Sequence, residues 1–161
     1  MAIGRAGPIM RVVMLAIGRD RNSSTADLVD SYAKRSTWRV DLIEIAARSH
    51  GSRSRRLANE AEKLRQAIPE GAAVIALDER GDNLDSRSLA DRIDCFRRDG
   101  RRAVVFMIGG ADGLDPTLGA EADLRLAFGR ATWPHRLVRV MLAEQLYRAS
   151  TILAGHPYHR D

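Results

Sequence analysis

The fold is decided by the stretch Ala103-Val104-Val105-Phe106-Met107-Ile108-Gly109-Gly110-Ala111-Asp112-Gly113. Its first six residues are all apolar, which is typical of a central parallel strand that is covered on both faces. The glycines that follow allow backbone amides to approach a ligand closely. Because ligands of open α/β sheets bind outside the carboxyl ends of the strands, this stretch predicts a central strand with a binding loop at its end.

Strands and helices alternate on either side of this stretch. Apolar or alternating patterns predict strands over 9–17, 38–45 and 72–77, and polar or glycine boundaries predict helices over 23–36, 57–67, 85–100 and 135–152. This alternation predicts an α/β fold with a mainly parallel sheet flanked by helices. Residues 1–9 show no periodicity, so we expect an N-terminal extension followed by a single domain over 10–161.

The composition limits the class of protein. The 161 residues contain one cysteine, which argues against a disulfide framework and a cysteine-based zinc site. The apolar run near the N-terminus is too short to span a membrane and lacks a signal-peptide pattern, so a soluble, cytoplasmic protein is expected. The chain has 26 basic against 21 acidic residues, and nearly all the basic ones are arginine. Arginine suits phosphates and bases, which is consistent with an RNA partner, although arginine richness can also be compositional.

Two loops other than the glycine loop carry concentrated polar groups. Residues 48–56 hold four arginines among serines and glycine, which indicates either a solvated loop or a mobile phosphate-binding arm. Residues 77–81, Leu-Asp-Glu-Arg-Gly, follow the strand over 72–77 and should share a crevice with 109–113. Neither glycine segment has the spacing of a nucleotide-binding motif, and Asp112 would repel a phosphate. We therefore favour a neutral or cationic small molecule in this crevice, the alternative being a simple tight turn.

The C-terminal segment contains most of the remaining candidate residues. Pro134 separates a loop over 128–133 from a helix that is apolar on more than one face, which indicates an oligomer interface. Glu144 and Arg148 stand four residues apart, and a surface ion pair is their simplest explanation. A metal site at His156 and His159 is disfavoured because the chain has a single cysteine, the nearby carboxylate is Asp161 alone, and Pro157 separates the two histidines. No serine lies in a nucleophile-elbow pattern, so nucleophilic hydrolysis is not expected.

Several blocks of this sequence resemble the RlmH family, small SPOUT methyltransferases that modify the large ribosomal subunit. The resemblance covers about residues 10–161. The blocks that carry it are Phe106–Leu114, Thr132-Trp133-Pro134-His135, Val138-Arg139-Val140, Ala143–Ala149 and Pro157-Tyr158-His159-Arg160.

The resemblance implies a SPOUT-type fold with a C-terminal trefoil knot, and S-adenosylmethionine as the cofactor. Its binding residues would be Leu77, Gly109, Phe128, Gly129, Arg130, Ala131, Thr132 and Trp133. The implied substrate is N3 of a pseudouridine in 23S rRNA, methylated in the assembled ribosome. The implied unit is a homodimer in which the cofactor site of one subunit faces the other.

Our hypothesis for the catalytic residues is that Tyr158, His159 and Arg160 act together with Arg148 to grip the nucleotide. His159 is the expected proton acceptor because histidine ordinarily titrates nearest neutral pH. Two alternatives remain open at this point. The chain could be a non-enzymatic ribosome-binding or assembly factor, or a SPOUT enzyme that methylates ribose 2′-hydroxyls.

Overall fold

The computed structural model describes residues 10–47 and 50–159. The expected extension over 1–9 lies outside this part of the chain. The strands are β1 (Arg11–Ile17), β2 (Arg39–Ile45), β3 (Ala73–Asn83), β4 (Val104–Ile108) and β5 (Leu124–Ala127). The helices are α1 (Ser24–Arg35), α2 (Arg53–Ala67), α3 (Ser86–Arg98), α4 (Pro116–Glu121) and α5 (His135–Ala154).

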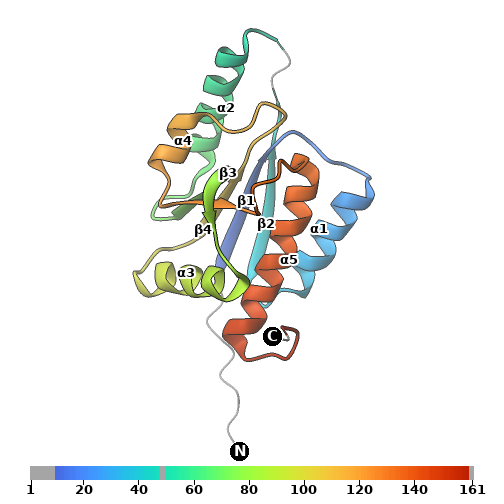
Figure 1. Ribbon diagram of the computed structural model, residues 1–161, viewed down its shortest axis with the longest axis vertical. Coiled ribbons are helices and arrows are strands. Elements are labelled where there is room, and N and C mark those ends of the chain that lie inside the picture. The colour runs from blue at the N-terminus through green and yellow to red at the C-terminus, as the bar shows by residue number, and fades with distance from the viewer. Residues whose placement is uncertain (1–9, 48–49, 160–161) are drawn as a thin grey trace, which may run out of the picture.

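The described strands form one five-stranded sheet in the order β2-β1-β4-β3-β5, and every pairing is parallel. The apolar stretch that opened the sequence analysis is β4, which occupies the middle of the sheet and is buried along its whole length. The prediction of an α/β fold with a parallel sheet flanked by helices is confirmed (Figure 1).

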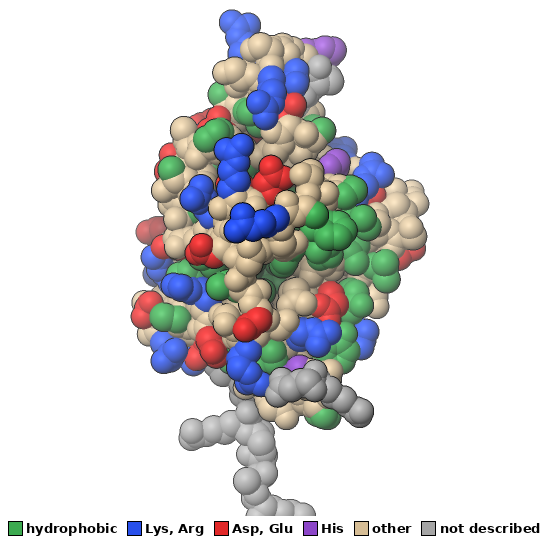
Figure 2. Space-filling view, viewed as in Figure 1, with side chains coloured by type: hydrophobic (Ala, Val, Ile, Leu, Met, Phe, Trp, Pro, Cys, Tyr) green, Lys and Arg blue, Asp and Glu red, His purple; other side chains and the backbone are tan. Residues whose placement is uncertain are grey.

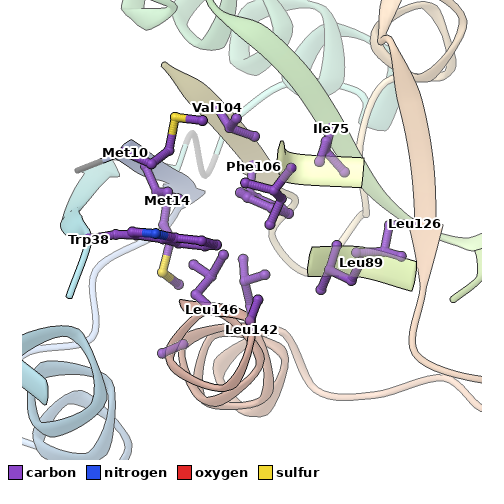
Figure 3. Close-up of a cluster of buried hydrophobic side chains, with 14 of the residues drawn as sticks. Met10, Met14, Trp38, Ile75, Leu89, Val104, Phe106, Leu126, Leu142 and Leu146 are labelled. Atoms are coloured by element: carbon purple, nitrogen blue, oxygen red, sulfur yellow. The ribbon is translucent and has the colours of Figure 1, made fainter. Parts of the chain in front are cut away.

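Helices cover both faces of the sheet because successive side chains of each strand point to opposite sides. On one face, Met14 and Phe106 pack in a core with Leu142 of α5, and α1 and α3 complete this layer. Figure 3 shows Trp38 and Phe106 in this core together with Leu142 and Leu146 of α5. The alternate strand residues pack on the other face, against α2 and α4. This arrangement explains why residues 103–108 are all apolar, because helices cover both faces of β4.

The loop expected over 48–56 is only partly a loop. Helix α2 begins at Arg53, since the Ser52 side chain caps it by accepting a hydrogen bond from the Arg55 amide. The prediction that Arg53, Arg55 and Arg56 lie in a loop is therefore wrong. Arginine forms helices readily, and the capping serine decided the boundary.

The segment between the glycine loop and residue 128 was not assigned by the sequence analysis. It contains α4, which Asp115 caps, and the short edge strand β5. Elements of six and four residues are too short to show a clear period.

Strand β3 is longer than predicted and carries an irregularity at its end. It pairs with β5 through Leu77 and then again through Asp82 and Asn83, so the residues between them bulge out of the ladder. A Cβ on Gly81 would lie only 2.6 Å from the carbonyl carbon of Arg125. Glycine at this position therefore allows the backbone of the β3 extension to lie directly against the backbone of β5.

Candidate active site

A cleft of about 790 Å³ opens at the carboxyl ends of β3, β4 and β5. Its walls come mainly from three segments, which contribute residues 77–80 of β3, residues 109–115, and residues 127–129 together with 131–135. The prediction that the segments 77–81 and 109–113 share a crevice is confirmed. Of the residues predicted to bind a cofactor, those that line the cleft are Leu77, Gly109, Phe128, Gly129, Ala131, Thr132 and Trp133. Arg130 lies in the same loop, is exposed, and is not among the residues that line the cleft.

The glycine loop is a tight turn as well as a cleft wall. A Cβ on Gly109 would lie 2.3 Å from the carbonyl carbon of Gly113, and Gly113 itself has a φ of +80°. The Gly113 amide donates a 3.0 Å hydrogen bond to the Gly110 carbonyl. Only glycine permits this close return of the backbone, which leaves the cleft wall without side chains at these positions.

The loop over 128–133 is tied to the end of β3. The Gly129 amide donates to Asn83 Oδ1 over 2.8 Å, and the Thr132 hydroxyl donates to Glu79 Oε2 over 2.8 Å. The Trp133 indole N–H donates to the Phe128 carbonyl, which folds the loop on itself. The first two of these hydrogen bonds fix the position of the 128–133 loop relative to the end of β3, on the other side of the cleft mouth.

The carboxylates that line the cleft have different partners. Asp112 is bound by Arg56 at 2.9 Å and lies 3.7 Å from Arg53, so the repulsion expected from it is offset. Asp115 caps α4, and the hydrogen bond from the Thr117 hydroxyl lowers its pKa.

Glu79 differs from the other carboxylates that line the cleft, Asp78 included. Asp78 lies 3.8 Å from the Arg125 guanidinium, whereas the partner of Glu79 within the described chain is the neutral hydroxyl of Thr132. Glu79 is therefore the carboxylate of the cleft whose charge is least compensated, and it is suited to a cationic ligand.

The sequence analysis missed a buried charged cluster beside the start of α5. Arg139 is 1% exposed and donates to the carbonyls of Ile17 and Gly18 and to Glu44. The neighbouring carboxylate of Asp20 is also buried, and hydrogen bonds from the Thr25 and Ser23 hydroxyls lower its pKa. The sequence signal that could have revealed this cluster is Asp20, which stands two residues after Gly18 at the end of the buried strand β1.

His135, the first residue of α5, also lines the cleft. Burial, reinforced by the positive charges of Arg139 and Arg136, lowers the pKa of its imidazole. A neutral ring therefore faces the cleft near pH 7.

A second cluster joins the C-terminal tail to the middle of α5. The Arg148 guanidinium donates to Glu144 Oε1 over 2.7 and 3.0 Å, and the Tyr158 hydroxyl lies 3.3 Å from the same oxygen. The Tyr158 ring packs against the Tyr147 ring in a tilted arrangement, with 4.4 Å between centroids and 54° between the ring planes. Burial, followed by the charge of Glu144, raises the pKa of Tyr158, so the phenol remains a hydrogen-bond donor at neutral pH. The ion pair expected of Glu144 and Arg148 is present, but it belongs to a larger, half-buried cluster.

The cleft and the tail cluster are separate in one chain. None of Arg148, Tyr158 and His159 lines the cleft. The Nδ1 atom of His159 is buried without a hydrogen-bond partner in the described part of the protein, and Arg160 lies outside the described residues. Among the residues described, no group of three or more histidine, cysteine or acidic side chains could hold a metal ion.

Charges on the surface are mixed. Figure 2 shows basic side chains, lysine and arginine together, interspersed with acidic ones over this face of the molecule. The excess of arginine is therefore not gathered into one uniformly basic area on the face shown. No helix within residues 10–47 and 50–159 has the length and apolar character needed to cross a membrane.

Comparison with known proteins decides the family. A family described as predicted SPOUT methyltransferases matches residues 10–159. The chain belongs to the SPOUT methyltransferase family. Two curated relatives, from Afipia carboxidovorans and Ruegeria pomeroyi, are each 48% identical over 159 residues, covering 94% of this chain and 99% of theirs. Both are named ribosomal RNA large subunit methyltransferase H, so the resemblance to the RlmH family is confirmed.

A solved structure supports the SPOUT fold. The probable methyltransferase from Bordetella pertussis Tohama I superimposes with a TM-score of 0.59 at 14% identity. The match covers 87% of this chain and 94% of that one. At this level of identity the likeness concerns the fold of this SPOUT protein alone.

Proposed function

We propose that this SPOUT protein is an S-adenosylmethionine-dependent methyltransferase that methylates N3 of a pseudouridine in 23S rRNA, acting on the ribosome in the cytoplasm. The observation that carries the proposal is a glycine-walled cleft with an uncompensated carboxylate, at the carboxyl ends of a SPOUT sheet. The name shared by its near full-length relatives supports ribosomal RNA as the substrate.

The cleft residues fit this cofactor. S-adenosylmethionine carries a sulfonium, an ammonium group and an adenine, and when bound it supplies an activated methyl group. Leu77 and Phe128 provide apolar walls, and Gly109 exposes backbone for close approach. Glu79 supplies a negative charge at the mouth, which suits the cationic groups better than a phosphate. The volume of about 790 Å³ lies within the range of small-molecule sites.

The tail residues fit the nucleotide chemistry. The N3 imide of pseudouridine must lose its proton to become a good nucleophile, and we assign this proton to His159. We assign Arg148 and Arg160 to stabilising the imidate that results, because guanidinium groups bind developing negative charge strongly. Tyr158 contributes a phenol O–H, which its raised pKa keeps protonated.

We propose that the active unit is a homodimer in which the tail of one subunit reaches the cleft of the other. The support is that the tail cluster and the cleft do not meet within one chain. Trp133 and Leu137, next to the cleft, are also more than 40% exposed although apolar. Mixing a tail-truncated variant with a cleft-defective variant tests this arrangement. We expect activity to return in the mixture, and a mixture that stays inactive would contradict it.

We also infer the trefoil knot that the resemblance implies. The support is the close approach of the β3 extension to the β5 backbone at Gly81, and the hydrogen bond from the Gly129 amide to Asn83 just after it. An experimental chain trace over residues 73–154, tested for a knot in this region, checks the inference.

The experiment that tests the function is methyl transfer from labelled S-adenosylmethionine to intact ribosomes and to free 23S rRNA. We expect transfer to ribosomes and a methylated base in the isolated nucleoside. A methyl group on ribose would instead identify a 2′-O-methyltransferase. If calorimetry shows no binding of S-adenosylmethionine, the enzyme assignment fails and a non-enzymatic assembly factor is left.

A further inference from the structure

We infer that Arg35 and Glu144 are positioning residues that hold the C-terminal tail in the orientation that methyl transfer requires. The inference rests on the proposed function of the tail. Neither residue was singled out for such a role by the sequence, because Arg35 is the last residue of α1 and Glu144 has an obvious helical partner.

Arg35 lies against a set of aromatic rings instead of a carboxylate. Its guanidinium carbon is 4.6 Å from the centroid of the Tyr147 ring and 5.7 Å from that of Tyr158. It is also 5.7 Å from the Tyr32 ring of its own helix. Within the described residues, Arg35 forms no ion pair, so its contacts to the rings account for its position. A cation over aromatic faces is attracted by their quadrupoles, and Arg35 thereby connects α1 to the tail.

Glu144 holds the other side of the same tail residue. One of its oxygens accepts both hydrogen bonds from Arg148 and lies within reach of the Tyr158 hydroxyl. Its second oxygen accepts from the side chain of Gln145, which in turn accepts from Ser86 at the start of α3. The carboxylate is 19% exposed, so these bonds are partly shielded from water.

The orientation of Arg148 depends on the same arrangement. The Arg148 guanidinium lies 5.1 Å from the Tyr158 ring while its N–H groups face Glu144. Tyr158 is thus held between two arginines and a carboxylate. The residue after it, His159, is the proposed proton acceptor, so a shift of Tyr158 moves both proposed catalytic groups.

The tail has few other connections in the described structure. The His156 amide donates to the Thr151 carbonyl at the end of α5, and the Tyr158 amide donates only within the tail, to His156. Beyond His156, the described hydrogen bonds and ring contacts to the rest of the protein pass through the Tyr158 side chain. Loss of Arg35 or Glu144 should therefore loosen the tail and leave the sheet and the cleft intact.

The test compares Arg35→Ala, Arg35→Lys and Glu144→Gln with Lys34→Ala in the full-length protein. Lys34 is the matched control, because it neighbours Arg35 but pairs with Asp30 on the exposed face of α1. Three readouts are needed. These are single-turnover methyl transfer on ribosomes, binding of S-adenosylmethionine by calorimetry, and the rate at which carboxypeptidase removes the C-terminal residues.

For Glu144→Gln we expect transfer to slow by about tenfold, in line with the loss of a charged hydrogen bond. For Arg35→Ala we expect a slowing of about threefold, in line with the loss of an exposed cation–ring contact. Cofactor affinity should stay within about twofold, since no cleft residue changes, and digestion of the tail should accelerate. Arg35→Lys should restore part of both rates because it keeps the cation. Lys34→Ala should match the wild type.

The inference is overturned if Arg35→Ala matches Lys34→Ala in both transfer and tail digestion. It is also overturned if cofactor affinity falls in parallel with transfer, which would indicate a general structural role. If the wild type itself transfers no methyl group to ribosomes, the proposed function fails. The digestion comparison then decides alone whether Arg35 and Glu144 hold the tail.

Discussion

The cleft and the tail cluster are built in different ways. The cleft is made by the bulged end of β3 and by the loops that follow β4 and β5, and its shape depends on backbone that returns closely on itself at Gly109 and Gly113. The tail cluster is made by side chains of α1, α5 and the tail. Helix α1 is far from the other two in the sequence, whereas the tail directly follows α5. The difference is consistent with the proposed division of roles, in which the cleft binds the cofactor and the tail cluster contacts the nucleotide. The predictions below test this division.

The largest effect is expected from removing the tail after Gly155. Turnover on ribosomes should fall by more than about 100-fold, because the proposed proton acceptor and its neighbours are lost. Cofactor binding should remain, since no residue of the tail lines the cleft. Calorimetry and single-turnover kinetics on the same preparation measure the two properties. Loss of cofactor binding would contradict the proposed separation of cofactor binding from nucleotide chemistry and would identify the tail as a structural element.

The proposed role of the cleft in cofactor binding is tested by Gly109→Ala. The new Cβ would meet the backbone of Gly113 at 2.3 Å, so the glycine loop must shift. A displacement of that kind should weaken cofactor binding by about 100-fold.

Gly100→Ala is the control for this change, measured by calorimetry and thermal unfolding. It places alanine at a φ of +79° in open space, away from the cleft. It should cost about 1–2 kcal/mol of stability without changing the affinity for the cofactor. Equal affinities for the two variants would show that the glycine loop does not contact the cofactor.

A smaller effect is expected for Glu79→Gln. The change removes a charge at the exposed mouth of the cleft and should raise the Kd for S-adenosylmethionine by about threefold to tenfold. S-adenosylhomocysteine lacks the sulfonium charge, so its Kd should change less. Glu70→Gln, at an exposed site outside the cleft, is the matched control. Equal losses for both ligands would indicate that Glu79 acts through its bond to Thr132.

The smallest effect concerns the buried cluster beside the cleft. Hydrogen bonds from Thr25 and Ser23 lower the pKa of Asp20 below its ordinary value of 3.8. Its contribution to the free energy of unfolding is therefore complete above that value and is lost as the pH falls through the lower, folded-state pKa. Asp20→Asn should cost about 1–2 kcal/mol at pH 7 and progressively less as the pH falls below 3.8.

Denaturant unfolding over this pH range measures the effect of Asp20→Asn. The exposed Asp30→Asn change is its control and should have a much smaller effect. A constant difference between Asp20→Asn and the wild type at all pH values would contradict the assignment to the Asp20 charge.

Parts of this protein were predictable because their signals are local. The apolar run of β4 predicted the centre of the sheet, and polar residues at 23–24 and 85–86 predicted where α1 and α3 begin. In the structure, Ser23 and Asp85 cap these helices. The loops at 77–81 and 109–113 were correctly expected to meet, because parallel strands end at the same edge. The cofactor and catalytic assignments came from the resemblance, and they remain predictions.

The sequence alone determined the α/β class, the central strand and the loops that line the cleft, because these follow from periodicity, capping and the conformational freedom of glycine. Only the tertiary structure decided which charged and polar side chains pair with one another. Asp112 is compensated by arginines of α2 while Glu79 is not, and Glu144 joins α5 to the tail. The physical reason is that charges interact through space. Charged partners can be far apart in the sequence, as Arg139 and Glu44 are at a separation of 95 residues, so the local pattern does not reveal them.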